Sequence, residues 1–209
     1  MSANPLGFAE LARAAALPVA NLGDAMDRLN VVDGAIHAVW PGARLTGPAF
    51  TVLTAGGDNR AIHEALEQVQ PGEVLVVNGQ GSTHRALIGE LIGGRAKVRG
   101  VAGMLIDGAV RDSAGLADLG FPVFARSVSP AGPYRNGPGR LQVPVAIGGV
   151  VVQPGDLIVA DDDGAAVVPW PDVESVLDRA EQKHAAESAE LIALTAELAG
   201  LRPAAETDR

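Results

Sequence analysis

The chain of 209 residues contains no cysteine, and aromatic residues make up only 3% of it. Without cysteine, a disulfide framework, a thiolate nucleophile and a cysteine-based zinc site are all excluded. With so few aromatic side chains, the core must be filled by the alanine, valine, leucine and isoleucine that dominate the 47% hydrophobic fraction. We therefore expect a core of many small aliphatic side chains.

Long apolar runs and a basic N-terminal region are also missing. No uninterrupted apolar segment is long enough to span a bilayer, and the N-terminus lacks the basic and apolar regions of a signal peptide. We therefore expect a cytoplasmic protein with no membrane partner. The net charge of −9 disfavours nucleic acid and anionic membranes as partners, whereas a local arginine suffices to bind a small anion.

Glycine (26 residues) and proline (14 residues) are spread between apolar runs, a pattern typical of short strands joined by tight turns. Helical and strand-like segments alternate in the middle of the chain, and strands follow one another afterwards, which indicates one mixed α/β domain. No internal repeat and no linker divides the chain. We expect a single domain over residues 1–202 and a frayed C-terminal tail over residues 203–209.

The predicted elements follow from hydrophobic periodicity, turn residues and capping residues. Asn21, Ser113 and either Ser82 or Thr83 are the expected N-caps of three helices. Helices are expected over residues 9–16, 21–29, 59–69, 82–98, 113–119 and 171–198, and strands over residues 47–55, 73–77, 101–106, 121–125, 143–147, 150–152, 157–160 and 165–168.

The segment after the predicted strand 101–106 carries the strongest indication of chemistry. A turn is expected at Asp107-Gly108, and Arg111 and Asp112 stand next to each other shortly after it. Arginine binds carboxylates through two parallel hydrogen bonds, and aspartate is a hard oxygen ligand for a divalent cation. The pair could hold an anionic substrate and a metal together, and the alternative is an ordinary surface ion pair.

Other polar clusters carry weaker signals. The glycine-rich loop 79–81 lacks the Gly-Lys-Ser/Thr ending of a phosphate-binding loop, and the acidic run 161–163 lacks the later ligands of a calcium loop, so it predicts a hairpin turn. His84 and Arg85 beside the glycine loop could contact a distal substrate carboxylate. The remaining candidates are expected to be structural or solvated, although the arginines could also line the mouth of a site: His37, His63, His184, Arg126, Arg135 and Arg140.

A longer pattern makes the Arg-Asp pair more specific. Glu90 is separated by 20 residues from Arg111, and Asp112 follows directly. This spacing, the upstream strand and glycine loop, and the passage IDGAVRD…FPVFAR resemble the RraA-like family. The chain is most similar to its 4-hydroxy-4-methyl-2-oxoglutarate/4-carboxy-4-hydroxy-2-oxoadipate aldolase branch. The resemblance implies the family's α/β fold, a mixed β/β/α swivelling-domain sandwich, and a homotrimer or a hexamer.

The resemblance also implies an activity and a set of site residues. Members of this branch are metal-dependent (class II) pyruvate aldolases that cleave small 2-oxo acids. The match makes Asp112 the ligand of Mg²⁺ or Mn²⁺, Arg111 the contact for substrate oxygens, and Glu90 the acidic group that orders a water near the reacting carbon. Many relatives have aspartate at the Glu90 position. The backbone turn expected to receive the substrate carboxylate consists of Gly89, Glu90, Leu91 and Ile92.

Oxaloacetate decarboxylation is the implied side activity, because loss of CO₂ produces the same pyruvate enolate. A Schiff-base mechanism has no support, since Lys97 is the only lysine near these motifs. The competing hypothesis is a non-catalytic regulator of a ribonuclease, as RraA itself is. The founding relative lacks the aspartate that follows the arginine, so the presence of Asp112 favours an enzyme.

Overall fold

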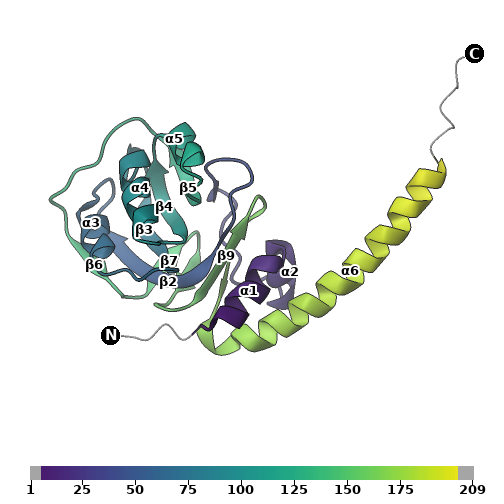
Figure 1. Cartoon of the computed structure of the whole chain (residues 1–209). Helices are drawn as coiled ribbons and strands as arrows, with labels where there is room; N and C mark the ends of the chain where they lie inside the picture. The colour runs from purple at the N-terminus through teal and green to yellow at the C-terminus, as the bar shows by residue number, and fades with distance from the viewer. Residues whose placement is uncertain (1–5, 202–209) are drawn as a thin grey trace, which may run out of the picture.

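The structure, a computed structural model, describes residues 6–201. It consists of a sheet-based body and one long helix that runs out from it (Figure 1). The helical elements are α1 (Phe8–Ala16), α2 (Val19–Ala25), α3 (Arg60–Leu66), α4 (Glu90–Val98), α5 (Ser113–Asp118), the 3₁₀ turn η1 (Trp170–Asp172) and α6 (Val173–Leu201). The strands are β1 (His37–Ala38), β2 (Leu45–Thr54), β3 (Val74–Ala86), β4 (Gly103–Val110), β5 (Val123–Val128), β6 (Gly139–Leu141), β7 (Val145–Ile147), β8 (Val150–Val152), β9 (Leu157–Asp161) and β10 (Gly164–Val168).

The main sheet has the strand order β1-β5-β4-β3-β2-β9-β10, with β6 paired to β2. Strands β2, β3, β4 and β5 are parallel neighbours, and each crossover between them contains one of the helices α3, α4 and α5. The ten-residue strand β2 joins two parts of the sheet, because its first half pairs antiparallel with β9 and its second half pairs with β3 and β6.

Both faces of the parallel strands are buried. In β3, Leu75 and Val77 belong to the core beneath α3, α4 and α5, whereas Val74 and Val76 belong to the core beneath the β7–β8 hairpin. Successive side chains of a strand point to opposite faces, and a strand covered on both sides therefore reads as a continuous apolar run. The layers are a small hairpin sheet, the main sheet and the helices, which confirms the mixed β/β/α sandwich.

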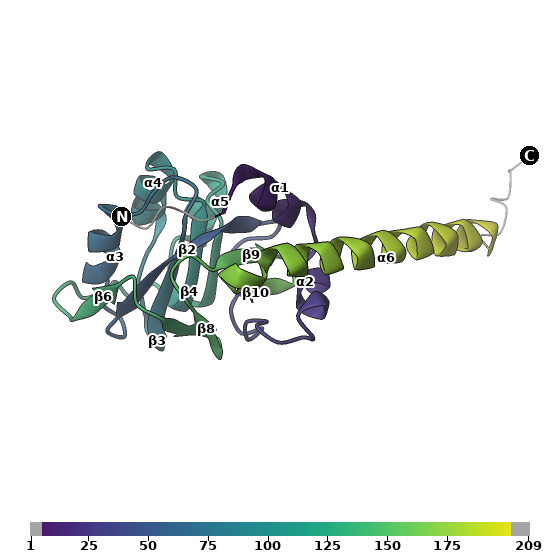
Figure 2. The same cartoon turned by 90° about the horizontal axis from the view of Figure 1, so that it is seen from below.

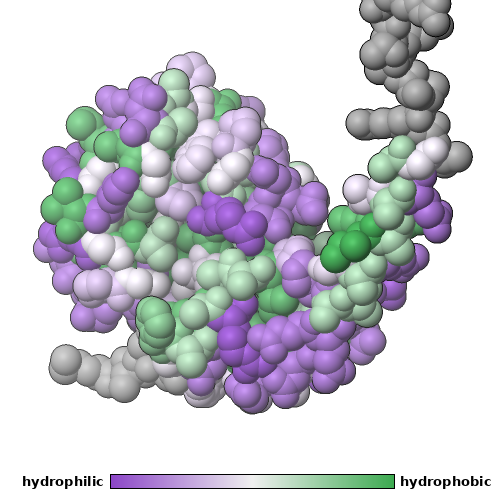
Figure 3. All heavy atoms as spheres, turned by 45° about the vertical axis from the view of Figure 1, so that its right-hand side comes forward, coloured by the Kyte–Doolittle hydropathy of each residue, from purple (hydrophilic) through white to green (hydrophobic). Residues whose placement is uncertain are grey.

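Helix α6 has two different halves. Near its start, Val176, Leu177 and Ala180 are buried in a third core with α1, α2, β9 and β10. The later half leaves the body (Figure 2), and it exposes apolar side chains that form a visible hydrophobic patch (Figure 3): Leu191, Ile192, Leu194 and Leu198. The predicted helix is confirmed, and it extends to Leu201.

Two predicted boundaries in the central strands are wrong. No helix begins at Ser82 or Thr83, because β3 continues to Ala86 and its pairing with β4 survives two register shifts. The shift follows Gln80 and Gly81, which adopt left-handed φ values of 57° and 65°. Strand β4 likewise runs through Asp107-Gly108 to Val110, so the expected turn there is absent. Pairing with a neighbouring strand overrides the local turn and capping signals.

The remaining corrections are local. Helix α2 begins at Val19 after the N-cap Pro18, and Asn21 does not cap it, since its side-chain amide donates to Glu187 Oε2 at 2.6 Å. Helix α5 takes Asp112 rather than Ser113 as its N-cap. The predicted tail 203–209 lies outside the described residues. Among residues 6–201, no helix has the length and apolar character required to cross a bilayer.

Arg13 fastens α1 to α6. Its guanidinium contacts Glu174 at 3.0 Å, Asp178 at 2.6 Å and Glu181 at 2.7 Å. We predict that Arg13→Gln lowers the free energy of unfolding by about 1 kcal/mol, and that 1 M NaCl reduces this difference, because the network is partly exposed. Arg28→Gln is the control, since Arg28 is 80% exposed and, within residues 6–201, pairs only with Asp24. Chemical denaturation at two salt concentrations measures both, and equal effects would contradict the prediction.

Candidate active site

The Arg-Asp pair and the glycine turn are brought together by backbone pairing around the ends of β3 and β4. Leu87 N donates to Ala109 O at 2.8 Å, and Arg111 N donates to Ile88 O at 3.0 Å. These bonds place the start of α4 beside the start of α5. Residues more than twenty positions apart in the sequence therefore lie side by side, as the resemblance implies for Glu90, Arg111 and Asp112.

Asp112 lies at the centre of this arrangement. Its backbone is left-handed, with φ 58° and ψ 45°, a conformation that aspartate tolerates better than most residues. Its Oδ2 atom accepts a hydrogen bond from Glu90 N at 3.2 Å and lies 3.4 Å from Arg111 Nε. The two side chains remain 38% and 41% exposed. The carboxylate is therefore oriented at the N-terminus of α4 while still accessible to a ligand.

Gly89 permits this close approach. A Cβ at position 89 would collide with the Asp112 carboxylate and with the Arg111 side chain. The hydrogen bonds of Ile92 N and Gly93 N to Gly89 O close the first turn of α4. Leu91 N has no hydrogen-bond partner among residues 6–201. Helix N-termini with free N–H groups bind anions, so the turn retains one donor for a ligand.

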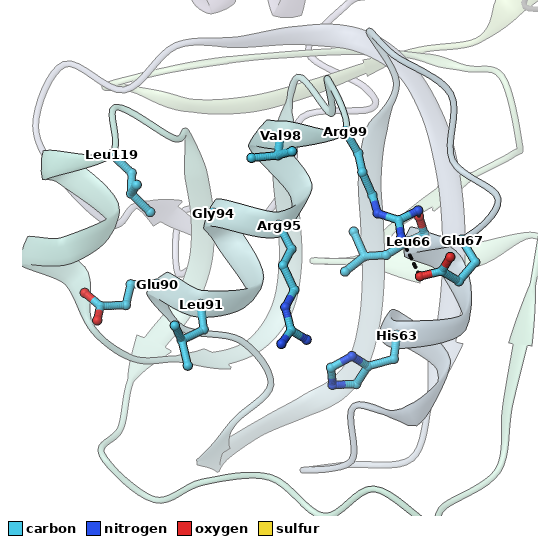
Figure 4. Close-up of a pocket in the computed structure, with 10 residues that line it drawn as sticks. All are labelled: His63, Leu66, Glu67, Glu90, Leu91, Gly94, Arg95, Val98, Arg99 and Leu119. Atoms are coloured by element: carbon cyan, nitrogen blue, oxygen red, sulfur yellow. Dashed lines mark hydrogen bonds and ion pairs between the residues drawn. The ribbon is translucent and has the colours of Figure 1, made fainter.

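The side chains of the turn point in different directions. Ile92 is on the buried face of α4, whereas Leu91 is 71% exposed. Glu90 lies against α5, where its carboxylate occupies the position that a Cβ on Gly115 would need. In Figure 4, Glu90 points toward the α5 side of the helix and away from Arg95. The Glu90 N–H is bonded to Asp112, but Glu90 lines a neighbouring groove and not the pocket that contains Arg111 and Asp112.

A small pocket of about 50 Å³ contains most of the predicted site residues. It also contains Asn59, which the sequence analysis did not name, and Arg135, for which lining the mouth of a site was one of two expectations. Asn59 is fully buried, and its amide donates to Leu87 O at 3.0 Å, so it supports the chain just before the glycine turn. The lining residues are Asn59, Leu87, Ile88, Gly89, Leu91, Ile92, Arg111, Asp112, Pro133 and Arg135.

The three arginines of uncertain role separate clearly. Arg135 lines the pocket, so of the two expectations for these arginines, a place at the mouth of the site holds for Arg135. Arg126 donates to Asp107 Oδ1 at 2.6 Å, which balances a nearly buried carboxylate inside the sheet. Arg140 lies on β6 outside this pocket. Only tertiary contacts distinguish these three arginines, because in the sequence each is a polar residue in a loop or at the end of a strand.

His84 and Arg85 lie on β3 and not on the predicted helix. Arg85 donates to Gly132 O at 2.9 Å and to the Tyr134 hydroxyl at 3.0 Å, and its guanidinium lies 4.2 Å from the centre of the Tyr134 ring. These contacts hold the loop that carries Arg135. Arg85 therefore stabilises the loop next to the pocket. Neither His84 nor Arg85 lines the pocket itself.

Asp58 fixes the other side of the same loop. Its carboxylate accepts hydrogen bonds from Arg60 N at 2.9 Å and from the N–H groups of Asn136 and Gly137, both at 2.8 Å. Burial alone would raise the pKa of Asp58, but these backbone donors and the nearby Arg60 charge lower the pKa below its usual value. The charged carboxylate is thus part of the scaffold that places Arg135.

The donor set restricts the kind of metal that fits. Within residues 6–201, no group of three or more histidine, aspartate and glutamate side chains is arranged to enclose an ion. A single accessible carboxylate matches Mg²⁺, which often keeps several waters and binds through one or two carboxylates together with its substrate. Asp112 fits this mode, whereas a structural zinc site would need four protein ligands.

Comparison with known proteins identifies the family of this chain. A family model described as RraA-like, Aldolase/RraA, matches residues 19–167. The chain belongs to the RraA-like family. Two curated relatives carry the name "Putative 4-hydroxy-4-methyl-2-oxoglutarate aldolase". The one from Halalkalibacterium halodurans is 37% identical over 89% of each chain, and the one from Burkholderia multivorans is 40% identical over 66% of this chain and 84% of its own.

Solved structures share the fold of this RraA-like chain. An uncharacterized protein from Pseudomonas syringae superposes with a TM-score of 0.81 at 30% identity, covering 92% of this chain and 94% of its own. RraAS2 from Streptomyces coelicolor, described as an unusual member of the RNase ES inhibitor RraA family, gives 0.80 at 32% identity, covering 88% and 96%. Relatives of this chain thus carry both aldolase and inhibitor names.

We predict that Asp58→Asn lowers the free energy of unfolding by about 1–3 kcal/mol near pH 7, because the charged acceptor of three N–H groups is lost. The folded pKa is lowered, so this stabilisation is present above the unfolded value of about 3.9 and disappears as pH falls through the folded pKa. Denaturation from pH 7 to pH 3 should show the difference from wild type shrinking. Asp162→Asn is the control, since Asp162 accepts one exposed backbone bond. A pH-independent difference would contradict the prediction.

Proposed function

We propose that this RraA-like protein is a divalent-metal-dependent lyase. It cleaves a 4-hydroxy-4-substituted 2-oxo diacid to pyruvate and a second oxo acid. The observation that carries the proposal is the meeting of Asp112, Arg111 and the Gly89 turn in one accessible pocket. The aldolase names of the relatives support the same reaction class.

In this proposal Asp112 holds Mg²⁺ or Mn²⁺, both of which accept oxygen-rich sites. When bound, the metal supplies Lewis-acid polarisation of the 2-oxo group. Arg111 binds the oxygen atoms at the same end of the substrate and offsets the negative charge that collects there during cleavage. The free Leu91 N–H at the start of α4 receives the carboxylate next to the 2-oxo group.

The reaction needs a proton to leave the C4 hydroxyl while the C3–C4 bond breaks. The electrons of that bond move to the C2 oxygen, and protonation of C3 then gives pyruvate. Glu90 borders Asp112 at the start of α4, and we assign it the ordering of a water that handles this proton. Loss of CO₂ from oxaloacetate leaves the same enolate, so decarboxylation is the expected side activity.

We also propose that the protein self-associates, as a homotrimer or as a hexamer. The support is the exposed apolar patch on the projecting half of α6, since exposed apolar patches often mark interaction sites. The second candidate function is regulation of a ribonuclease by protein contact, favoured by the similarity to RraAS2. The accessible Asp112 gives the enzyme the stronger case.

We predict that Asp112→Asn lowers pyruvate release from oxaloacetate and from 4-hydroxy-4-methyl-2-oxoglutarate by on the order of 10²-fold or more, because the metal loses its carboxylate. A lactate dehydrogenase coupled assay with and without Mg²⁺ measures it. Asp118→Asn, at the far end of the same short helix, is the control and should retain activity. A wild-type protein that is folded and loaded with metal but releases no pyruvate would refute the proposal.

We predict that Gly89→Ala also removes most activity, because the new methyl group displaces the Asp112 carboxylate and Arg111. The free energy of unfolding should fall by no more than about 3 kcal/mol, since the displaced atoms are at the ends of side chains. Gly94→Ala is the matched control on the same helix, where a Cβ finds its nearest neighbour at 3.8 Å. Equal activity in the two alanine variants would show that the close approach is not needed.

A further inference from the structure

One wall of the pocket comes from an irregular segment. Pro133 and Arg135 line the pocket, and both belong to residues 129–138, the connection between β5 and β6 that we call the strap (Figure 1). The strap contains no helix and no strand of its own. Its position relative to Arg111 and Asp112 therefore depends on individual contacts and not on a ladder of sheet hydrogen bonds.

Tyr134 divides the strap into two faces. Its N–H donates to Gly57 O at 2.9 Å, and its carbonyl accepts from Asn59 N at 3.0 Å. The strap thus pairs with the chain just before α3 as an isolated bridge. Successive side chains of an extended chain point to opposite sides. Accordingly, both neighbours of Tyr134 line the pocket, whereas the Tyr134 ring is 57% exposed and does not line it.

The Tyr134 ring is held by Arg85 on β3. Arg85 Nη2 donates to the Tyr134 hydroxyl at 3.0 Å, and Arg85 Nη1 donates to Gly132 O at 2.9 Å. The central carbon of the guanidinium lies 4.2 Å from the centre of the ring. One guanidinium therefore contacts the strap on both sides of Pro133. We call this set of contacts between Arg85 and the strap the clasp.

Gly57 permits the clasp to form. Its φ of 73° is left-handed, and a Cβ at this position would lie only 3.1 Å from Arg85 Cβ and Cδ. The carbonyl of Gly57 also binds the Tyr134 backbone. Strand β3, which carries Arg85, pairs with β4, and β4 leads to Arg111 and Asp112. The clasp therefore connects the strap to the strands that place the rest of the pocket.

A second anchor of the strap lies beyond Arg135. Asp58 accepts hydrogen bonds from the N–H groups of Asn136 and Gly137, both at 2.8 Å. Arg135 is thus located between the clasp and this anchor. Loss of the clasp would release one end of the strap while the other end stays bound. We therefore expect a local change at the pocket wall and not a general loss of structure.

We infer that Arg85 and Tyr134 are positioning residues that act on the bound ligand through the strap. The inference rests on the proposed function, which places a 2-oxo acid beside Arg111 and Asp112. Without the clasp, the strap takes up several positions, and the apparent affinity falls by the fraction of molecules in which the pocket wall is in place. The clasp touches no reacting atom, so it affects ligand binding and leaves the chemical step unchanged.

The kinetic test measures pyruvate release from 4-hydroxy-4-methyl-2-oxoglutarate with Mg²⁺. Arg85→Met removes the charge and the donors, and Tyr134→Leu removes the ring. Each should raise KM about fivefold to tenfold, the size expected for a cation–π contact with hydrogen bonds, and should leave kcat within about twofold of wild type. Arg85→Lys, which keeps a charge near the ring, should recover part of the affinity. A lower kcat with unchanged KM would overturn the inference, since it would indicate only a loss of folded enzyme.

A double-mutant cycle tests whether the two side chains act as one unit. The double variant Arg85→Met/Tyr134→Leu should raise KM no more than about twofold beyond either single variant, because each single change already opens the clasp. An effect equal to the product of the two single effects would show that the side chains act separately, and it would overturn the inference.

Arg99→Gln is the matched control. Arg99 also joins two segments near the surface, because it donates to Leu66 O and to the Glu67 carboxylate, but it lies outside the strap. Its KM and kcat should stay within about twofold of wild type. A KM as high as that of Arg85→Met would show that the loss of any such arginine suffices, which would contradict a specific role of the clasp.

The ring of Tyr134 reports on the clasp directly, because it is the only tyrosine in the chain. Isotopic labelling of tyrosine rings therefore gives the NMR signals of this one residue. In Arg85→Met these signals should move, because the ring loses the adjacent guanidinium, whereas Arg99→Gln should leave them in place. Signals that are the same in wild type and Arg85→Met would show that the clasp does not form in solution.

Binding without turnover separates this inference from the proposed reaction. 2-Oxoglutarate has the main carbon chain of the substrate but lacks the C4 hydroxyl, so calorimetry with this acid and Mg²⁺ measures recognition alone. Its Kd should be about fivefold higher in Arg85→Met and unchanged in Arg99→Gln. If no substrate yields pyruvate but this difference is found, the proposed reaction fails and the clasp stands. Equal Kd values in wild type and Arg85→Met overturn the clasp alone, and a wild type that does not bind the acid contradicts both.

Discussion

The parallel pairing of β3 with β4 is the constraint on which the candidate site depends. It persists past two register shifts and ends with Leu87 bonded to Ala109 and Arg111 bonded to Ile88. These last bonds set the first turn of α4 against Asp112. Loss of this pairing would separate the glycine turn from the Arg-Asp pair, because no other described contact joins the backbones of the two segments so closely.

The pairing requires unusual local geometry, which the sequence supplies through a few residues. Gln80 and Gly81 take up left-handed φ values where the register changes, and Gly89 leaves room for the Asp112 carboxylate. The nearly buried Asp107 is balanced by Arg126 and by Gly148 N. The charge of Asp107 is thus balanced within the sheet, and the left-handed residues are accommodated there. The exposed polar groups at the end of the sheet remain accessible to a ligand.

The fold itself does not decide between the two functions found among its relatives. Two sequence relatives carry the name of an aldolase and one similar solved structure carries the name of an inhibitor, and a fold can host unrelated activities. The argument for a lyase rests on the site, where one accessible carboxylate, one arginine and one free N–H meet. That argument depends on the charge of individual side chains and not on the architecture.

The sequence by itself determined the α/β class, the buried strands, the long C-terminal helix and the spacing that joins Glu90 to Arg111 and Asp112. The elements follow from local apolar patterns, and the motif was identified through its resemblance to the RraA-like family. Only the tertiary structure decided that β3 runs on to Ala86, that Asp107 is inside a strand, and that Arg135 and Asn59 line the pocket. These outcomes depend on contacts between distant segments, whose energies outweigh the local preference for a turn or a cap.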